Sequence, residues 1–236
     1  MKKNILLIAA LALLTLGFTS CEKKSEGLTS ITYYAEILLE GDDFMVVAKG
    51  STFTEPGYSA TMAGKDVTDK VQVSSDLDTS VSGVYSIIYS MENADGFTAS
   101  VSRTVVVLDL NDPIEGFWAV TPTSTREYNG NTVEYGAPFE ILIIGEGDGV
   151  YLVDDMFAGW YAQRAGYGSA YAMEGEIEIA DNGTITLIDS YLIGWGDSVE
   201  ELNNGKYDAA SSSITYQAVY NKGTMFFNVT LNKVEL

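Results

Sequence analysis

The residues best suited to contact a ligand lie in two short stretches of the second half of the chain. The first, FAGWYAQRAGYGSAYAMEG, runs from Phe157 to Gly175 and combines aromatic side chains with glycines and one arginine. The second, YLIGWGD, runs from Tyr191 to Asp197 and pairs a tryptophan with a carboxylate. Tyrosine and tryptophan offer rigid ring faces with a polar tip, which suit sugar rings, peptides and aromatic partners. Arginine can bind a carboxylate at two points or stack on a ring.

These two stretches predict one ligand-binding site without catalytic residues. The rings would stack on the ligand, while Arg164 and Asp197 would fix its orientation. The candidate residues are Trp160, Tyr161, Arg164, Tyr167, Tyr171, Trp195 and Asp197. The alternative is a purely structural role, because barrels and sandwiches need aromatics for their cores and glycines for their bends. Arg164 would then pair with Asp154 or Asp155.

The residue types that are absent limit any catalytic chemistry. The chain has no histidine and a single cysteine, which excludes Ser-His-Asp and Cys-His sites and zinc sites that use histidine. A glycosidase would need two carboxyl groups about 5 to 9.5 Å apart in a cleft, and no pair of acids stands out. Glu174, Glu176 and Glu178 alternate along one expected strand, and we interpret them as a solvated outer face. We predict no catalytic residue, no metal site and no cofactor.

The chain is strongly acidic. It carries 33 acidic and 13 basic residues, a net charge of −20. Such a surface repels nucleic acid and anionic lipid headgroups, so we expect no nucleic-acid partner. Solubility outside the cell is the simplest reason for this charge.

The first twenty residues have the features of a lipoprotein signal peptide. Two lysines precede a mostly apolar run from Ile5 to Phe18, which is too short to span a bilayer. The sequence FTSC, ending at Cys21, resembles a bacterial lipobox. The resemblance implies that Cys21 becomes the lipidated N-terminus and anchors the protein in the outer membrane. Residues 22–30 are polar and would form a tether.

Beyond residue 30 the pattern is that of an all-β protein. Short β-rich runs alternate with turn signals, and no 3.6-residue apolar stripe is convincing. Asp95-Gly96 and Asp181-Asn182-Gly183 are strong hairpin signals. Two β-rich runs flank a turn at 41–43. Alternation also predicts a strand through 157–162, broken by a loop or bulge at 163–168.

The segment LDLNDP, residues 108–113, separates two β-rich units. Its acids and Asn111 could bind Ca²⁺, but a hydrated linker closed by Pro113 explains them more simply. The second unit, with roughly eight expected strands, suggests a small antiparallel barrel or sandwich. The predicted segments are a signal peptide at 1–20, a tether at 21–30, a β-sandwich domain at 31–110 and a β-barrel or sandwich domain at 113–236.

Residues 49–107 resemble a bacterial surface Ig-like domain. The motifs EPGY, GKDVT, GVY and NADG carry the resemblance and occur in the family's order. The resemblance implies a small Ig-like β-sandwich whose Gly and Pro residues shape turns. Domains of this kind commonly act as spacers.

The whole chain resembles a two-domain lipoprotein family of Bacteroidetes whose function is unknown. In the second unit, the match rests on GWYAQRAGYGSAYAMEG (159–175) and GWGDSVEEL (194–202). The resemblance implies a lipobox, an Ig-like domain and then a lipocalin-like β-domain. It also implies a place beside an outer-membrane uptake system of the SusC/SusD type.

Three functions remain open at this point. The leading hypothesis is a non-catalytic surface lipoprotein that captures a glycan, peptide or small apolar ligand, or assists assembly, for a SusC/SusD-type transporter. The second is a lipocalin-like carrier of a small apolar molecule or lipid, which requires a hollow barrel. The third is a purely structural or adhesive surface protein with an exposed aromatic patch.

Overall fold

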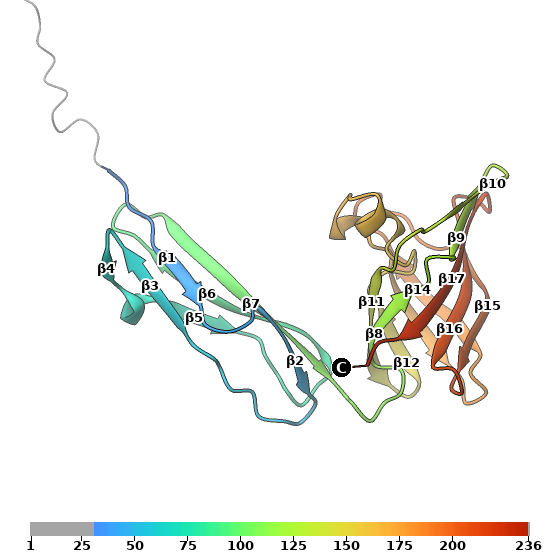
Figure 1. Ribbon diagram of the computed structural model, residues 1–236, viewed down its shortest axis with the longest axis horizontal. Helices are drawn as coiled ribbons and strands as arrows, with labels where there is room; N and C mark the ends of the chain where they lie inside the picture. Colours follow the sequence, from blue (N-terminus) through green and yellow to red (C-terminus); the bar gives the residue numbers. More distant parts are fainter. Residues whose placement is uncertain (1–30, 236) are drawn as a thin grey trace, which may run out of the picture.

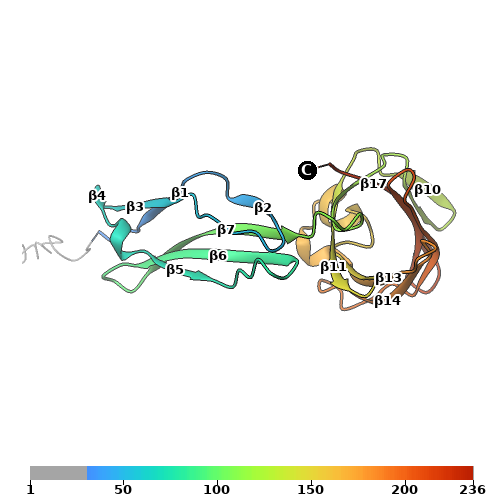
Figure 2. The same cartoon turned by 90° about the horizontal axis from the view of Figure 1, so that it is seen from below.

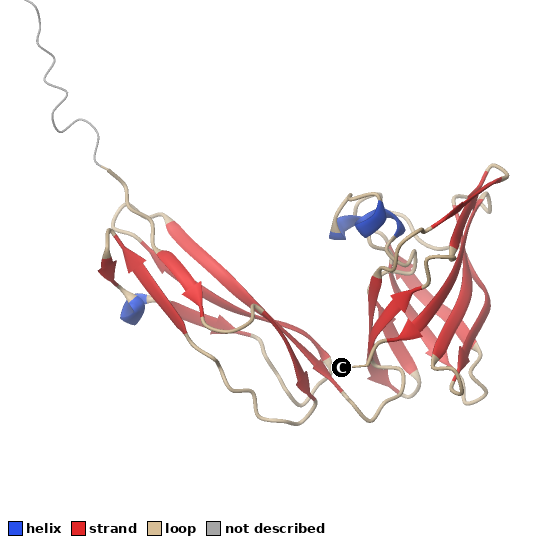
Figure 3. Cartoon of the chain, viewed as in Figure 1, coloured by secondary structure: helices blue, strands red, loops and turns tan. Residues whose placement is uncertain are grey.

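The computed structural model describes residues 31–235, and it confirms the predicted all-β fold (Figure 1). The expected signal peptide, the lipidated Cys21 and the tether lie outside the described residues. Helical structure within the described part is limited to short turns, most of them above one end of the second unit (Figure 3). No helix between residues 31 and 235 is long and apolar enough to cross a membrane.

The first unit is a sandwich of two small sheets. One sheet has the strand order β1-β3-β4, and the other has the order β2-β7-β6-β5. Alternate residues of the strands, among them Ile37, Tyr89 and Val105, bury their side chains between the sheets. The bounds are β1 (Glu36–Leu39), β2 (Phe44–Ala48), β3 (Tyr58–Met62), β4 (Lys65–Asp66), β5 (Gln72–Ser75), β6 (Gly83–Glu92) and β7 (Thr98–Leu108).

The two strands that flank residues 41–43 do not pair with each other. Strand β1 pairs with β3 in antiparallel orientation, whereas β2 pairs with β7 in parallel. Where the chain changes sheets, the buried Arg103 of β7 donates hydrogen bonds to the carbonyl groups of Glu40 and Asp42. The hairpin predicted at Asp95-Gly96 is confirmed and joins β6 to β7.

The second unit is one curled antiparallel sheet of ten strands (Figure 2). The hairpin predicted at 181–183 is confirmed, and a second hairpin joins β16 to β17. Strands β14 and β15 are not paired with each other, and only an isolated bridge between Thr184 and Lys206 lies between the two edges, so the sheet stops short of a closed barrel. The bounds are β8 (Gly116–Val120), β9 (Thr125–Tyr128), β10 (Asn131–Glu134), β11 (Glu140–Gly147), β12 (Val150–Val153), β13 (Glu174–Ile179), β14 (Ile185–Tyr191), β15 (Glu201–Asp208), β16 (Ser213–Tyr220) and β17 (Met225–Lys233).

The concave face of this sheet is filled by large side chains. Phe157 stacks on Phe227 with ring centroids 4.3 Å apart, and Trp118 is fully buried. On β16 the residues Ile214 and Tyr216 point into this core and alternate with more exposed neighbours. A lipocalin-like carrier would need an open interior here, so the packing counts against that alternative.

A small apolar cluster and one buried carboxylate join the two units. Phe117 of β8 packs with Val106 and Leu108 of β7. The buried Glu115 accepts hydrogen bonds from the Ser82 hydroxyl at 3.0 Å and the Asp109 backbone N–H at 2.8 Å. These contacts hold the end of β7 next to the start of β8.

The acids of the 108–113 segment cap turns. Asp109 accepts a hydrogen bond from the Asn111 N–H at 3.0 Å, and Asp112 accepts one from the Ile114 N–H at 2.7 Å. Within residues 31–235 no group of three acidic, cysteine or histidine side chains is arranged to hold a metal ion. The contacts support the linker interpretation of this segment.

We expect residues 29–110 and 113–236 to unfold cooperatively when each is expressed alone. Each contains its own buried cluster, and the shared cluster at the joint is the smallest of the three. Thermal melts followed by circular dichroism test this. Broad, non-cooperative melts of both segments would contradict the division into two folding units.

Candidate functional site

The loop between β12 and β13 leaves the extended conformation that alternation predicts for 157–162. Residues Trp160–Arg164 form a π-helical turn, and Ser169–Tyr171 form a 3-10 turn. The strand prediction fails because Ala158 and Gly159 adopt left-handed backbone angles, with φ of 51° and 80°. Glycine is needed at 159, since a Cβ there would lie 2.8 Å from the Cβ of Phe139.

One buried carboxylate ties both ends of this loop together. Asp155 accepts backbone hydrogen bonds from Phe157 at 2.9 Å, Gly159 at 3.0 Å and Met173 at 3.0 Å. Burial raises the pKa of Asp155 to about 6, although these three donors act in the opposite direction. These three hydrogen bonds connect the start and the end of the loop through one side chain.

Four of the seven candidate residues form one cluster, which we call the aromatic cap: Tyr161, Tyr167, Tyr171 and Trp195. The ring centroid of Trp195 lies 4.8 Å from that of Tyr161 and 5.1 Å from that of Tyr171. Tyr167 and Trp195 are 55% and 45% exposed. The two separate stretches of sequence therefore meet, as predicted, and present ring surface to solvent.

Trp160 points in the opposite direction, into the core. It is 5% exposed, and its ring contacts Tyr135 with centroids 4.9 Å apart. The left-handed turn at 158–159 directs this side chain inward. Trp160 is therefore a core residue that packs against Tyr135 and Phe227, and it does not offer the direct ligand contact expected from the sequence.

Arg164 is held against this buried tryptophan. Its guanidinium lies 4.2 Å from the centroid of the Trp160 ring, and its Nε donates to the Tyr135 carbonyl at 3.0 Å. Arg164 forms no ion pair with Asp154 or Asp155. Among residues 31–235, the ion pair that does form is Arg103 with Glu55. Arg126, which sequence reasoning missed, also lies over the Trp160 ring, at 4.9 Å.

Asp197 closes the turn that presents Trp195. Its backbone carbonyl accepts a hydrogen bond from the Leu192 N–H at 2.7 Å, and its carboxylate accepts one from the Ser198 N–H at 2.9 Å. Burial of Tyr220, together with the Asp197 carboxylate, raises the pKa of that phenol. Asp197 is exposed beside the cap, where it can reach a polar group of a ligand.

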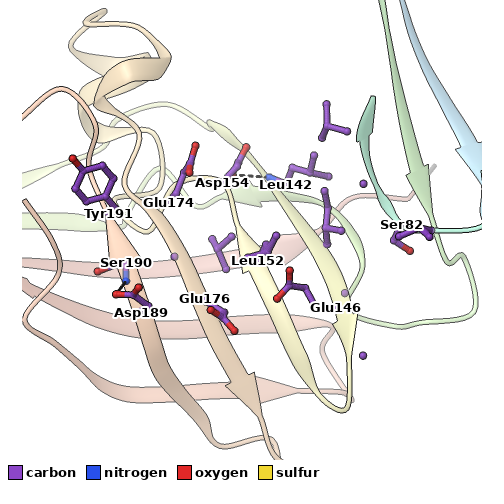
Figure 4. Close-up of a pocket in the computed structure, with 18 of the residues that line it drawn as sticks. Ser82, Leu142, Glu146, Leu152, Asp154, Glu174, Glu176, Asp189, Ser190 and Tyr191 are labelled. Atoms are coloured by element: carbon purple, nitrogen blue, oxygen red, sulfur yellow. Dashed lines mark hydrogen bonds between the residues drawn. The ribbon is translucent and has the colours of Figure 1, made fainter. Parts of the chain in front are cut away.

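A groove of about 700 Å³ runs along the outer face of β11 to β14 towards the first unit (Figure 4). Leu142 and Leu152 contribute apolar surface, and Val81 contributes apolar surface from the first unit. The groove is strongly acidic, with a single basic residue, Lys49. Its carboxylates are Glu146, Asp154, Glu174, Glu176 and Asp189.

One end of the groove lies at Tyr191. This residue lines the groove, ends β14 and directly precedes the turn that carries Trp195. Desolvation raises the pKa of Asp154, the hydrogen bond from the Leu142 N–H acts in the opposite direction, and the nearby Asp155 raises the pKa further. Glu174 and Glu176 lie on the outer face of β13, while Gly175 and Ile177 are buried. Alternation correctly places these acids outside, but it does not reveal the groove.

Comparisons with known proteins agree with both units. The model of the bacterial surface protein Ig-like domain matches residues 37–107, and the model of a C-terminal domain family matches residues 107–233. The solved structure of the lipoprotein BT2262 from Bacteroides thetaiotaomicron is 36% identical, with a TM-score of 0.72. The similarity covers 85% of this chain and all of that one. The chain belongs to the BT2262 lipoprotein family.

Membership of this family confirms the predicted architecture and identifies a bacterial surface lipoprotein. Neither family description names a catalytic activity. No curated protein matches the chain.

More distant structural similarity is weak. CBM51-2 and INT domains of ZmpB from Clostridium perfringens, in complex with GlcNAc, are 19% identical over 55% of this chain and 34% of that one, with a TM-score of 0.27. The M60 catalytic domain with the CBM51-1 and CBM51-2 domains of the same protein is 16% identical over 86% of this chain and 21% of that one, with a TM-score of 0.28. Similarity at this level says nothing about the ligand.

Proposed function

We propose that this lipoprotein is a non-catalytic ligand-capture subunit of a SusC/SusD-type uptake system. Lipidated Cys21 anchors it in the outer membrane, and the Ig-like unit acts as a spacer. The second unit captures a glycan or peptide at the aromatic cap and passes it to the neighbouring transporter. The transporter partner follows from the family resemblance, and the binding surface follows from the geometry of the cap.

The observation that carries this proposal is the exposed pair Tyr167 and Trp195. Their ring centroids are 6.4 Å apart and their planes meet at 85°, so the two faces form a corner. Such a corner can receive a sugar ring on one face and a second ring or an apolar side chain on the other. Asp155 holds the loop in place before a ligand binds, so less conformational entropy of the loop is lost on binding.

The acidic groove extends this surface from Tyr191 towards the first unit. A long ligand would extend beyond the cap into the groove. The groove carboxylates can accept hydrogen bonds from hydroxyl or ammonium groups of that part of the ligand. Sugars supply the first kind of group and peptides the second. Both ligand classes are therefore compatible with the combined surface.

Replacing Trp195 or Tyr167 by Ala is expected to weaken ligand binding with little loss of stability. Aromatic stacking contributes about 0.5–1.5 kcal/mol per ring beyond burial, so each change should reduce affinity by up to about tenfold. Glycan and peptide arrays identify the ligand, and titration then compares the variants. Val73→Ala, which truncates an exposed side chain of the first unit, is the matched control. Unchanged affinity of both aromatic variants would rule out the cap as the binding surface.

Replacing Cys21 by Ala is expected to abolish membrane association and leave the folded domains unchanged. The lipid chains alone supply the anchor in this proposal, since Cys21 is the only cysteine and no disulfide is lost. Fractionation of cells that express the variant tests this, with the thermal melt of the purified chain as a control. Mature variant protein that still sediments with membranes like the wild type would disprove lipid anchoring.

A further inference from the structure

An exposed apolar patch lies at the end of the first unit where the described chain begins. We call it the N-terminal patch: Ile31, Tyr33, Tyr34 and Phe97. These side chains are between 50% and 74% exposed. The rings of Tyr34 and Phe97 lie together, with centroids 5.7 Å apart and a tilt of 49°. None of the four residues belongs to the buried core of the first unit, so their apolar surface remains available for an outside contact.

The patch is held in place by one buried amide. The Asn93 side chain donates a hydrogen bond from Nδ2 to the Tyr33 carbonyl at 2.7 Å. Its Oδ1 accepts hydrogen bonds from the N–H groups of Asp95, at 3.0 Å, and Phe97, at 2.9 Å. Asn93 thereby fastens the first described residues to the β6–β7 turn. Because these hydrogen bonds hold the backbone on both sides, the four side chains form a defined surface.

The position of the patch relative to Cys21 identifies what covers it. Ten residue steps separate Cys21 from Ile31, and a chain extends by at most about 3.3–3.6 Å per residue. Even when fully extended, ten steps reach no further than about 33–36 Å. A lipid on Cys21 would therefore keep the patch close to the bilayer surface at a high effective concentration.

We propose that the N-terminal patch rests on the lipid headgroup layer of the membrane that holds Cys21. This inference rests on the lipid anchor of the proposed function. Tyrosine and other aromatic residues favour the interface because their rings are apolar and the tyrosine hydroxyl can bind water or headgroups. Because the protein carries a net charge of −20, the contact should be more favourable on an uncharged bilayer surface than on an anionic one.

The contact would orient the whole molecule. The start of the described chain and the β6–β7 turn lie at one end of the first unit, and the second unit lies beyond the other end (Figure 1). With the N-terminal patch on the membrane, the first unit points away from it. The aromatic cap is then held outside the headgroup layer, where a soluble ligand can reach it.

A chemically anchored protein tests the patch directly. The chain from residue 21 onwards is coupled through its single thiol, Cys21, to a maleimide lipid in phosphatidylcholine vesicles. A Phe97→Trp variant carries a fluorescent reporter in the patch, and the three natural tryptophans all belong to the second unit. Phosphatidylcholine brominated near the headgroup quenches tryptophans that touch the interface. We expect Phe97→Trp to gain a lipid-quenched emission component that the parent chain lacks.

The matched control is Val81→Trp, which places the same reporter at an exposed position beside the other unit. We expect its added emission to escape quenching. Replacing Tyr33 and Tyr34 by Ser in the Phe97→Trp chain should then remove most of the quenched component, while thermal melts confirm that every variant is folded. Equal quenching of Phe97→Trp and Val81→Trp would overturn the proposal, and so would an unquenched Phe97→Trp, as expected if a protein partner covers the patch instead.

This design separates the inference from the anchor on which it rests. The maleimide coupling supplies an anchor whether or not cells lipidate Cys21. If Cys21→Ala leaves membrane association unchanged in cells, the proposed anchor is wrong, and the vesicle result still reports whether the patch prefers the interface. If the anchor is right and the patch is not quenched, only the contact proposed here is wrong.

Discussion

Replacing Trp160 by Ala is expected to lower the free energy of unfolding of the second unit by about 3–5 kcal/mol, the usual cost of removing a buried aromatic side chain. The indole ring packs against Tyr135 and Phe227, and Arg126 and Arg164 lie over it. Truncation leaves a cavity and removes the surface that positions both guanidinium groups. Chemical denaturation followed by fluorescence or circular dichroism measures the loss.

Trp195→Ala is the matched control for this change. Both residues are tryptophans in glycine-containing stretches, but Trp195 is 45% exposed and Trp160 is 5% exposed. We expect Trp195→Ala to have a much smaller effect on unfolding and Trp160→Ala to affect binding only through loss of the fold. Similar denaturation midpoints for Trp160→Ala and the wild type would show that Trp160 is not a core residue.

Replacing Glu55 by Ala is expected to destabilise the first unit by about 3–5 kcal/mol, because it leaves a buried charge without its partner. The Arg103 side chain is fully buried, and its Nη2 donates to Glu55 Oε1 at 3.0 Å and to the Glu40 carbonyl at 2.8 Å. Without the carboxylate, the guanidinium keeps neutral acceptors only. Thermal and chemical unfolding of the Ig-like unit measure the effect.

Three variants identify the cause of that loss. Glu36→Ala removes an exposed acid of the same unit, and we expect little change. Glu55→Gln keeps an acceptor for Arg103 but no charge, so its loss should be intermediate. Combining Glu55→Ala with Arg103→Met should recover part of the stability, because no unpaired charge then remains in the core. If Glu55→Ala costs no more than Glu36→Ala, the ion pair does not stabilise the fold.

The glutamate of EPGY illustrates what a motif shows and what it leaves out. The motif correctly indicates the Ig-like fold and a turn, and Gly57 adopts a φ of 120° that favours glycine. The partner of Glu55 lies 48 residues further along the chain. Residue spacing does not reveal such a pair, because it forms only when β7 lies across the turn that contains the motif.

Local patterns were sufficient for the fold class and for most hairpins. Two-residue alternation and turn residues act over a few positions, so the hairpins at 95–96 and 181–183 could be predicted. Strand partners between sheets could not be predicted in the same way. The strands around residues 41–43 pair with β3 and β7 because each must cover a different part of the core, and that choice depends on residues far along the chain.

The sequence by itself determined which residues could form a binding surface, since two stretches rich in aromatic residues and glycine stand out by composition. Only the tertiary structure decided their roles. Trp160 and Trp195 have similar neighbours in the chain, but the left-handed turn at 158–159 and the buried Asp155 direct Trp160 into the core. The curled sheet then brings Trp195 beside Tyr167 at the surface. Exposure depends on which distant residues pack against a side chain, and such packing arises only when the whole sheet has curled around its core.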